Sequence, residues 1–331
     1  MKYSVIVPVY NRVDEVRDLL KSLSEQSFKD FEVILVEDGS TDKCDEVASS
    51  YSDLLALQYY HKSNEGRSIA RNYGIERAKG DYFIFFDSDC VIPAEYFATL
   101  DAELEKHYVP CFGGPDAAHE SFSDVQKAIN FTMTAFLTTG GIRGGKVQME
   151  KFVPRSFNMG YSREVWEKVG GFREMFSEDI DMSTRIRQAG FEISLIRPAF
   201  VYHKRRVDFA KFARQTHVFV MSRITLKLLY PGSLKLVHCL PAVFVLGVAA
   251  MVVLSLLWKW WAILPLAVYV AALWLTALIS TKSLKISLLA VLSAFIQLGS
   301  YGIGFIRAYV WKIVLGHGRN IEEEVERRRG K

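Results

Sequence analysis

Residues 82–89 read Tyr-Phe-Ile-Phe-Phe-Asp-Ser-Asp, an aromatic and aliphatic run followed by two carboxylates around a serine. A short apolar run that stops at polar residues is typical of a strand buried on both faces. In mainly parallel α/β sheets, ligands bind beyond the carboxyl ends of the strands. The pattern therefore predicts a buried strand at 82–86 that presents Asp87, Ser88 and Asp89 to a ligand.

The residues before this strand repeat the same arrangement. Apolar runs at 4–9 and 31–36 are followed by Tyr10-Asn11 and by Glu37-Asp38. A helix is expected between the two runs, because apolar side chains recur there at the spacing of one helix face: Val16, Leu19, Leu20 and Leu23. Strand and helix alternate from here to residue 86, so we predict an α/β fold with a mainly parallel sheet and helices on both faces.

Three more elements are expected before residue 82. Gly39-Ser40-Thr41-Asp42 offers turn and helix-capping residues ahead of a short helix. Residues 54–60 are typical of a strand, and residues 70–79 of a helix closed by Gly80. These assignments bring three polar clusters to the same edge of the sheet.

Asp87 and Asp89 have two interpretations. Their carboxylates can hold one divalent ion on a diphosphate, and hard oxygen ligands suit Mg²⁺ or Mn²⁺. Alternatively, they form an ordinary strand end with a helix cap ahead of Pro93. A lone Asp-x-Asp motif does not decide between the two.

A second acidic cluster, Ser177-Glu178-Asp179-Ile180-Asp181, opens a helix that is expected to run to Gly190. Carboxylates in a first helical turn are favoured by the macrodipole alone. The functional interpretation makes Asp179 a general base that takes a proton from an attacking hydroxyl. Transfer of a sugar with inversion needs one such base, since a metal can stabilise the departing diphosphate.

Two basic segments accompany these carboxylates. Residues 140–146, Gly-Gly-Ile-Arg-Gly-Gly-Lys, indicate a mobile loop near a cleft. His203-Lys204-Arg205-Arg206 is expected to face donor phosphates, anionic lipid headgroups, or both.

The composition changes along the chain. No acidic residue occurs between Asp208 and Glu322, so the net charge of +4 conceals a basic C-terminal third. Uncharged stretches at 236–258, 260–281 and 286–306 are each close to the ~20 residues of a membrane-spanning helix. Cations and tryptophans lie between them as interface anchors do: Lys259, Lys282, Lys285, Trp258, Trp260 and Trp261.

The number of membrane spans stays open at this point. The first apolar run is short and contains Pro8, unlike a secretory signal, so the large domain is expected in the cytoplasm. Three full spans would then place Arg327-Arg328-Arg329 outside, against the positive-inside tendency. Either the third stretch, with Gly299, Gly302 and Gly304, does not fully cross, or the tail is an exception.

We expect a catalytic domain at 1–208, an interfacial helical linker at 209–234, two to three spans at 235–315 and a basic polar tail at 316–331. The helix at 209–229 mixes aromatic and basic side chains, and it either lies along the membrane surface or is an ordinary linker. The four cysteines lack metal-ligand spacing and fit a reducing compartment: Cys44, Cys90, Cys111 and Cys239.

Taken together, these motifs resemble the family 2 glycosyltransferases with the GT-A nucleotide-diphospho-sugar transferase fold. The resemblance covers roughly residues 3 to 206 and depends on the order of the segments. The matching segments are 5–11, 36–42, 64–66, 70–72, 87–89, 158–160, 170–172 and 178–179.

The resemblance implies a role for each matching position. Pro8, Tyr10 and Asp38 would surround the nucleotide base, with Arg71 near the nucleotide. Asp87, Ser88 and Asp89 would bind ribose, diphosphate and metal, Asp179 would be the base and Glu178 its neighbour. Asn158, His203 and Arg205 would lie near acceptor or phosphate, with His203 as a third metal ligand after Asp89 and Asp87.

Two departures from the family pattern qualify these roles. Glu37 stands where many relatives carry aspartate, and it leaves Asp38 free for the base contact. Gln215 and Arg223 only loosely resemble the Gln-x-x-Arg-Trp motif of processive relatives, which favours transfer of a single sugar.

The expected enzyme is therefore an inverting, Mg²⁺- or Mn²⁺-dependent glycosyltransferase at the cytoplasmic face of the cell membrane. Its donor would be a nucleotide-diphosphate sugar, with UDP-sugars favoured, and its acceptor a hydroxyl of a lipid-linked or polysaccharide-precursor molecule. No nucleic-acid partner is expected. Transfer to a polyprenyl phosphate is the alternative activity, and an inactive membrane scaffold is the alternative from another class.

Overall fold

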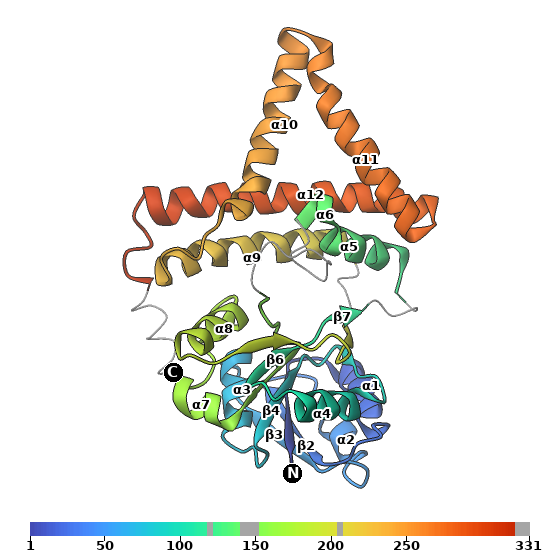
Figure 1. Ribbon diagram of the computed structural model, residues 1–331, viewed down its shortest axis with the longest axis vertical. Coiled ribbons are helices and arrows are strands. Elements are labelled where there is room, and N and C mark those ends of the chain that lie inside the picture. The colour runs from blue at the N-terminus through green and yellow to red at the C-terminus, as the bar shows by residue number, and fades with distance from the viewer. Residues whose placement is uncertain (118–121, 140–151, 204–207, 322–331) are drawn as a thin grey trace. The chain divides into compact units, whose positions relative to one another are not determined.

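The computed structural model describes residues 1–117, 122–139, 152–203 and 208–321 (Figure 1). It divides into two compact units. The first contains the described residues of 1–119 and 152–204, and the second those of 120–151 and 205–324. Three predicted features lie outside the described residues: the glycine-rich loop at 140–146, the basic residues 204–206 and the tail arginines 327–329.

The first unit is built on a seven-stranded sheet in the order β3-β2-β1-β4-β8-β6-β9. Strand β1 pairs in parallel with β2 and β4, and β2 pairs in parallel with β3. Strand β8 is antiparallel to both of its neighbours, whereas β6 and β9 are parallel. The strands are β1 Tyr3–Val9, β2 Phe31–Asp38, β3 Leu57–Lys62, β4 Tyr82–Phe86, β6 Cys111–Gly113, β8 Asn158–Ser162 and β9 Ile193–Leu195.

Helices cover both faces of this sheet, which confirms the predicted fold class. Alternate residues of β1 serve opposite faces: Val5 belongs to the cluster with α1, and Ile6 to the cluster with α8. The helices of the first unit are α1 Val13–Ser24, α2 Asp45–Ser49, α3 Arg67–Ile75, α4 Tyr96–Lys106, α7 Arg163–Val169 and α8 Glu178–Gln188.

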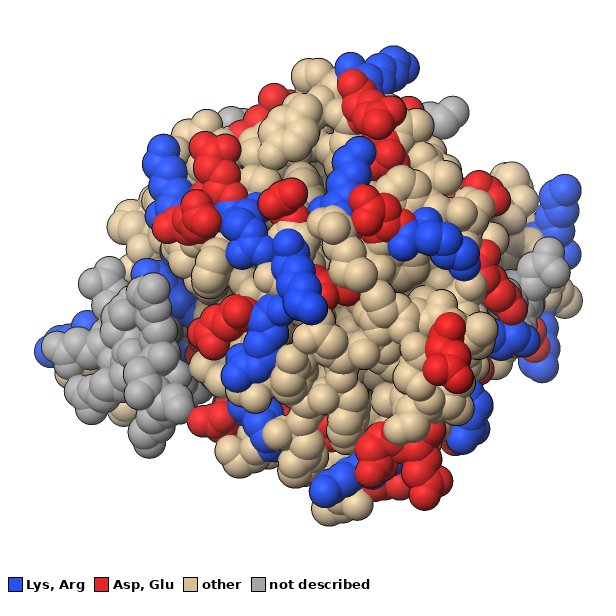
Figure 2. Space-filling view, turned by 90° about the horizontal axis from the view of Figure 1, so that it is seen from below, with Lys and Arg blue, Asp and Glu red and all other residues tan. Residues whose placement is uncertain are grey.

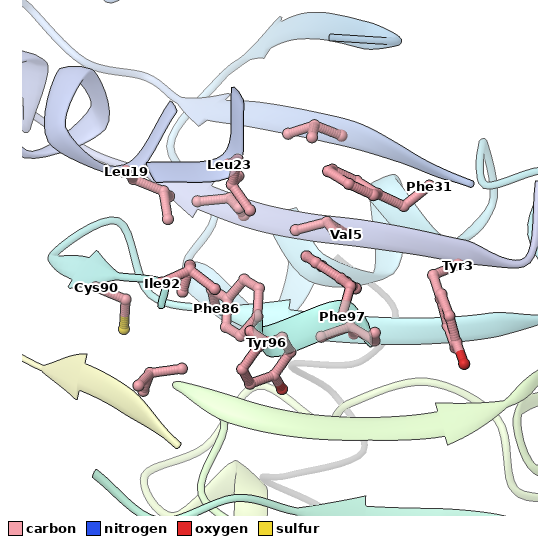
Figure 3. Packing of buried hydrophobic residues seen from close by; sticks show 14 of the residues in the cluster. Tyr3, Val5, Leu19, Leu23, Phe31, Phe86, Cys90, Ile92, Tyr96 and Phe97 are labelled. Atoms are coloured by element: carbon pink, nitrogen blue, oxygen red, sulfur yellow. The ribbon is translucent and has the colours of Figure 1, made fainter. Parts of the chain in front are cut away.

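The core on the α1 side is largely aromatic. Figure 3 shows Tyr3, Phe86, Tyr96 and Phe97 among the buried side chains packed against the strands; Tyr96 and Phe97 belong to helix α4. The rings of Phe31 and Phe97 are stacked, with centroids 4.4 Å apart and planes 8° apart. Such rings fill the space between helix and sheet, so the strand ends that follow them are held in fixed positions.

Three local expectations change in the structure. The predicted helix capping by residues 39–42 is wrong: α2 begins at Asp45, and its N-cap Cys44 makes no side-chain capping bond. The backbone amides of Thr41 and Asp42 instead donate to Asn11 Oδ1. The other differences are in boundaries, because β3 lies at 57–62 and α3 at 67–75.

A small sheet extends the carboxyl edge of the main sheet. Strand β10 (Val201–His203) lies between β5 (Cys90–Val91), to which it is antiparallel, and β7 (Asp116–Ala117), to which it is parallel. His203 is the direct partner of Cys90 in this pairing. The pairing brings His203 next to the Asp87-Ser88-Asp89 turn.

The second unit is helical. It contains α5 Asp124–Thr134, α6 Phe136–Thr139, α9 Phe209–Leu229, α10 Leu240–Leu257, α11 Leu264–Thr281 and α12 Leu284–Tyr309. Short 3₁₀ segments precede α10 and α11, at Leu236–Cys239 and Trp260–Ile263, and a π segment, Val310–Val314, follows α12. Three of its helices are long and apolar enough to cross a membrane: Leu236–Leu257, Trp260–Thr281 and Leu284–Val314.

Helix α5 lies in the second unit, although its residues fall within the range 1–208 expected for the catalytic domain. Its Ala128 is fully buried with Ala277, Ile286 and Ala290 of α11 and α12. The Thr132 hydroxyl donates to Ala290 O at 3.2 Å. Burial of this small-residue face favours the helical unit over the sheet.

Candidate active site

A cavity of about 450 Å³ lies at the carboxyl edge of the main sheet in the first unit. This volume is within the usual range for small-ligand sites. The residues that line it come from the ends of β1 and β2, the start of α3 and the loop before α8: Pro8, Val9, Tyr10, Asp38, Asn64, Gly66, Arg67, Glu174, Met175 and Phe176. Pro8, Tyr10 and Asp38, which the sequence assigned to the nucleotide base, are therefore gathered in one cavity.

Asp38 fixes the turn that enters α3. Its Oδ1 accepts hydrogen bonds from Lys62 Nζ at 2.9 Å and Glu65 N at 3.0 Å, and its Oδ2 accepts from Gly66 N at 2.8 Å. Gly66 has φ +102°, and a Cβ there would lie 2.6 Å from Glu174 Oε1. The left-handed backbone conformation favours glycine at this position, and the Glu174 carboxylate lies where a Cβ would be.

Asn11 and Glu37 brace the neighbouring loop. Asn11 is in the left-handed region at φ 51°, and its Oδ1 accepts from Thr41 N at 2.9 Å and Asp42 N at 3.1 Å. The fully buried Glu37 accepts from Ser40 Oγ and, at 2.9 Å, from Cys44 N. The longer side chain of Glu37 thus points into the fold, while Asp38 lines the cavity.

Arg71 lies beneath the cavity and connects two acidic motifs that are far apart in sequence. Its guanidinium group is fully buried. Nη2 donates to Asp87 Oδ1 at 2.7 Å, and Nη1 donates to Glu178 Oε1 at 2.9 Å. The other oxygen of Glu178 accepts from Arg67 Nη2 at 2.8 Å. Arg71 was expected near the nucleotide, and its geometry is that of a bridge between carboxylates.

The segment Arg155–Asn158 connects the same groups from the other side. Ser156 Oγ accepts from Arg71 Nη2 at 3.1 Å. The ring of Phe157 stacks on His203, with centroids 4.4 Å apart and planes 16° apart. Asn158 has no exposed surface, and its amide joins Tyr96 OH, at 2.6 Å, to Ala199 O, at 2.9 Å. Asn158 therefore holds the segment in place from within the core.

Asp179 occupies the first turn of α8, which begins after Ser177 in the left-handed conformation. Asp179 Oδ1 accepts from the backbone amide of Ile180 at 2.8 Å, and Oδ2 accepts from Arg155 Nη1 at 3.2 Å. The residue is 9% exposed. These contacts orient the carboxylate, which is not among the residues that line the cavity.

Asp89, Cys90 and His203 form a potential metal-binding group, with ligand atoms within 4.8 Å of one another. His203 Nε2 lies 3.1 Å from Asp89 Oδ1, and both side chains are partly exposed. His203 Nδ1 is buried without a hydrogen-bond partner among the described residues. Burial raises the pKa of the Cys90 thiol well above its ordinary value. Asp87, also expected as a metal ligand, pairs with Arg71.

The sequence did not indicate several residues of this site. Arg67 is one of them: it lies four residues before the expected Arg71 on α3, and this spacing places both on the face that meets Glu178. Glu174 and Phe176 closely precede the Glu178-Asp179 pair, so their proximity to it was a usable signal. Arg155 carried no such signal.

Two further residues were predicted from the sequence. Ser88 is buried beside Asp87 and Asp89, and Arg205 lies outside the described residues.

Residues 4–170 match the sequence model described as glycosyl transferase family 2. An uncharacterized glycosyltransferase of Rickettsia conorii is 44% identical over 88 residues, which are 27% of this chain and 15% of that protein. The uncharacterized glycosyltransferase EpsJ of Bacillus subtilis is 29% identical over 201 residues, 59% of this chain and 56% of that protein. The chain thus spans less than two thirds of the length of these relatives.

Solved structures share the fold. The mannosyltransferase PcManGT from Pyrobaculum calidifontis in complex with GDP-Man and Mn²⁺ has a TM-score of 0.65 and 17% identity, covering 92% of this chain and 87% of that one. S. aureus TarS 1–349 in complex with UDP-GlcNAc has a TM-score of 0.50 and 21% identity, covering 92% and 91%. At these identities the likeness shows the fold alone.

Proposed function

The chain belongs to glycosyl transferase family 2, and we propose that it transfers a single sugar, with inversion, from a nucleotide-diphosphate sugar to a hydroxyl. The donor is favoured to be a UDP-sugar, and the acceptor a lipid-linked or polysaccharide-precursor molecule. The observation that carries the proposal is the buried Arg71, which joins Asp87 on the donor side to Glu178 on the acceptor side. The carboxylates proposed for the donor and for the acceptor therefore lie in one cluster around Arg71.

The cavity suits the nucleotide. Its volume of about 450 Å³ accommodates a base and ribose, and the half-exposed ring of Tyr10 offers a face for stacking. Asp38 is already fixed by Lys62 and two backbone amides, so its carboxylate is preorganised to accept one more hydrogen bond from a base. Arg67, on the cavity wall, extends toward Glu178 and the reacting groups.

Asp89 and His203 fit a divalent cation such as Mn²⁺ or Mg²⁺. A carboxylate oxygen and an imidazole nitrogen 3.1 Å apart form a compact pair of donors. The Cys90 thiol does not suit these ions, because Mg²⁺ and Mn²⁺ prefer hard oxygen ligands to sulfur. When bound, the ion supplies positive charge that stabilises the departing diphosphate.

Asp179 is proposed as the general base. Its carboxylate accepts the hydroxyl proton while the acceptor oxygen bonds to the anomeric carbon of the sugar. The bond from that carbon to the diphosphate oxygen breaks, and its electron pair leaves with the nucleoside diphosphate. Arg155 holds Asp179 Oδ2, and the Ile180 amide holds Oδ1, so the base is oriented before the acceptor arrives.

A second candidate is transfer to a polyprenyl phosphate. Arg155 favours it, because a guanidinium group beside Asp179 can bind an anionic acceptor instead. An acceptor phosphate is already ionised and gains little from a base. The effect of removing the Asp179 charge therefore separates the two candidates.

Asp179→Asn tests the base. For a hydroxyl acceptor, transfer is expected to fall by about 10²- to 10⁴-fold, with donor affinity nearly unchanged. The measurement is nucleoside diphosphate release from a panel of nucleotide sugars, with lipid extract supplying the acceptor. The exposed Asp53→Asn is the matched control. Activity within threefold of the parent chain would remove Asp179 from the mechanism and favour the phosphate acceptor.

Asp89→Ala tests the metal site. We expect the variant to lose the Mn²⁺-dependent part of donor affinity, which titration calorimetry with and without Mn²⁺ measures. Asp18→Ala, on the water-facing side of α1, is the control. If the parent chain binds the nucleotide equally with and without Mn²⁺, the metal role is rejected.

The second unit supports a place at the membrane. Its three long apolar helices are consistent with membrane association. We propose a multi-pass protein of the cell membrane with the catalytic unit on the cytoplasmic side. A cytoplasmic position gives the site access to nucleotide sugars.

A further inference from the structure

Helices α10 and α11 form a hairpin whose two open ends rest on α12 (Figure 1). At the start of α10, a Cβ at Gly302 would lie 2.3 Å from Pro241 O. At the end of α11, Ala277 is buried with Ile286 and Ala290 of α12. Toward the tip of the hairpin the side chains are exposed, with Leu256 at 79% and Trp260 at 71%.

These contacts place α12 across the hairpin rather than alongside either helix. Residues 290 and 302 are separated by about 18 Å along a helix at 1.5 Å per residue. One contacts the end of α11 and the other the start of α10. A third span parallel to α10 and α11 would instead follow one of them toward the tip.

Helix α12 also packs against α5 and α9, and both of these helices carry charged side chains. Lys285 Nζ lies 2.7 Å from Asp124 Oδ2 of α5. Lys312 Nζ donates to Thr225 Oγ1 of α9 at 2.5 Å, and Lys227 lies over the ring of Tyr309 at 5.1 Å. Helix α9 itself carries four cations: Lys211, Arg214, Arg223 and Lys227.

A full crossing by α12 would draw α9 into the apolar core of the bilayer. A Lys or Arg side chain at the centre of a span is costly to insert, because the charge loses its hydration. With α12 in the plane of the interface, these cations remain in the headgroup region. Leu284, Leu288 and Leu292, spaced by one helical turn and exposed, then face the acyl chains.

The distribution of charge gives the orientation. Residues 209–321 contain eleven Lys and Arg and no Asp or Glu. Lys259 alone lies at the hairpin tip, beside Trp258, Trp260 and Trp261, and the other ten lie on or next to α9 and α12. Such an asymmetry places the α9 and α12 side in the cytoplasm and the tryptophans at the opposite interface.

We propose that the chain crosses the membrane only twice, through α10 and α11, and that α12 with α9 forms a layer in the cytoplasmic interface against anionic headgroups. This proposal rests on the membrane location proposed above and not on the catalytic assignment. Each spanning segment has 22 residues, about 33 Å of helix, and matches a bilayer core of about 30 Å. Residues 310–321, which follow α12, then also lie on the cytoplasmic side.

Thiol labelling in intact bacterial cells tests the path of the chain. Lys259→Cys, Lys282→Cys and Arg319→Cys are each made in a Cys239→Ser background, because Cys239 is partly exposed whereas Cys44, Cys90 and Cys111 are buried. The Cys239→Ser chain is the control. We expect a membrane-impermeant maleimide to label Lys259→Cys in intact cells, and the other two only after permeabilisation.

Two results would overturn the inference. Labelling of Arg319→Cys in intact cells would make α12 a third span, and labelling of Lys259→Cys only after permeabilisation would show that the hairpin does not cross. A C-terminal fusion to green fluorescent protein is an independent readout: fluorescence supports two spans, and a dark, exported fusion contradicts them. Sugar transfer is measured separately, so failure of the catalytic proposal does not alter these readouts.

Discussion

The same side chain has opposite surroundings in the two units. Leu20 on α1 is fully buried, whereas Leu256 on α10 is 79% exposed. A soluble fold buries most of its leucine side chains, since the hydrophobic effect is its main source of stability, and exposes others only singly, as at Leu54. The second unit leaves a continuous set of leucine, valine and tryptophan side chains uncovered. The difference indicates that the two units fold against different solvents.

Charges differ between the units in a corresponding way. Figure 2, seen from below the view of Figure 1, shows acidic and basic side chains intermixed on one face. The first unit also buries charge, because Arg71, Glu178 and Asp181 are almost completely inaccessible. From residue 209 to 321 the second unit carries cations alone. Buried pairs organise the site, while a segment that carries only basic charges suits an anionic headgroup surface.

The largest expected effect concerns the buried pairs. Arg71→Met leaves Asp87 and Glu178 without their shared cation, and breaking a buried pair costs about 3–5 kcal/mol. We expect a marked fall in the melting temperature of the detergent-solubilised chain. Arg17→Met, which removes an exposed pair with Asp14, is the control and should change stability by less than about 1 kcal/mol. Equal melting of the two variants would refute the bridging role of Arg71.

A smaller effect is expected from leucine truncation, which tests the difference in solvent directly. Leu20→Ala opens a cavity in the sheet core and should cost about 2–5 kcal/mol. Leu256→Ala, in detergent, should alter stability by less than about 0.5 kcal/mol. Thermal unfolding followed by tryptophan fluorescence measures both. Similar losses would mean that the hairpin is buried against protein.

The smallest effect concerns Glu174 at the cavity wall. Burial raises the pKa of this carboxyl group, so its contribution to stability is present at low pH and is lost as pH rises through the folded-state pKa. The melting temperature of Glu174→Gln should therefore be higher than that of the parent chain at pH 8. The difference between the two melting temperatures should become smaller toward pH 4. The exposed Glu25→Gln is the control. If the difference in melting temperature instead became larger at low pH, the raised pKa of Glu174 would be refuted.

Strands with strong local patterns were predictable. The run at 82–86 is β4 in the structure, and the carboxylates after it lie at the site edge. Helix α1 buries Val16, Leu19, Leu20 and Leu23 as their spacing predicts. The predicted helix capping by residues 39–42 was wrong because the backbone amide of Thr41 donates a hydrogen bond to Asn11, thirty residues earlier in the chain. A local pattern does not show a partner from another strand.

The residues of the candidate site also divide into those that the sequence indicated and those that it did not. Asp38 and Asp87 were proposed from sequence because they lie at the ends of predicted strands, and Asp179 because it opens a predicted helix, whereas Arg155 was not proposed. Arg71 and Asn158 belong to the expected motifs, yet the structure buries both completely. Burial and pairing depend on which distant segments meet, so a motif identifies a residue without giving its contacts.

The sequence by itself determined the α/β class, the order of the acidic motifs and the presence of three long apolar segments, because these depend on periodicity and residue type along one stretch of chain. Only the tertiary structure decided that Arg71 bridges Asp87 and Glu178, and that α12 lies across the α10 and α11 hairpin. Both depend on packing between residues far apart in the chain, where burial and charge pairing, rather than local pattern, set the free energy.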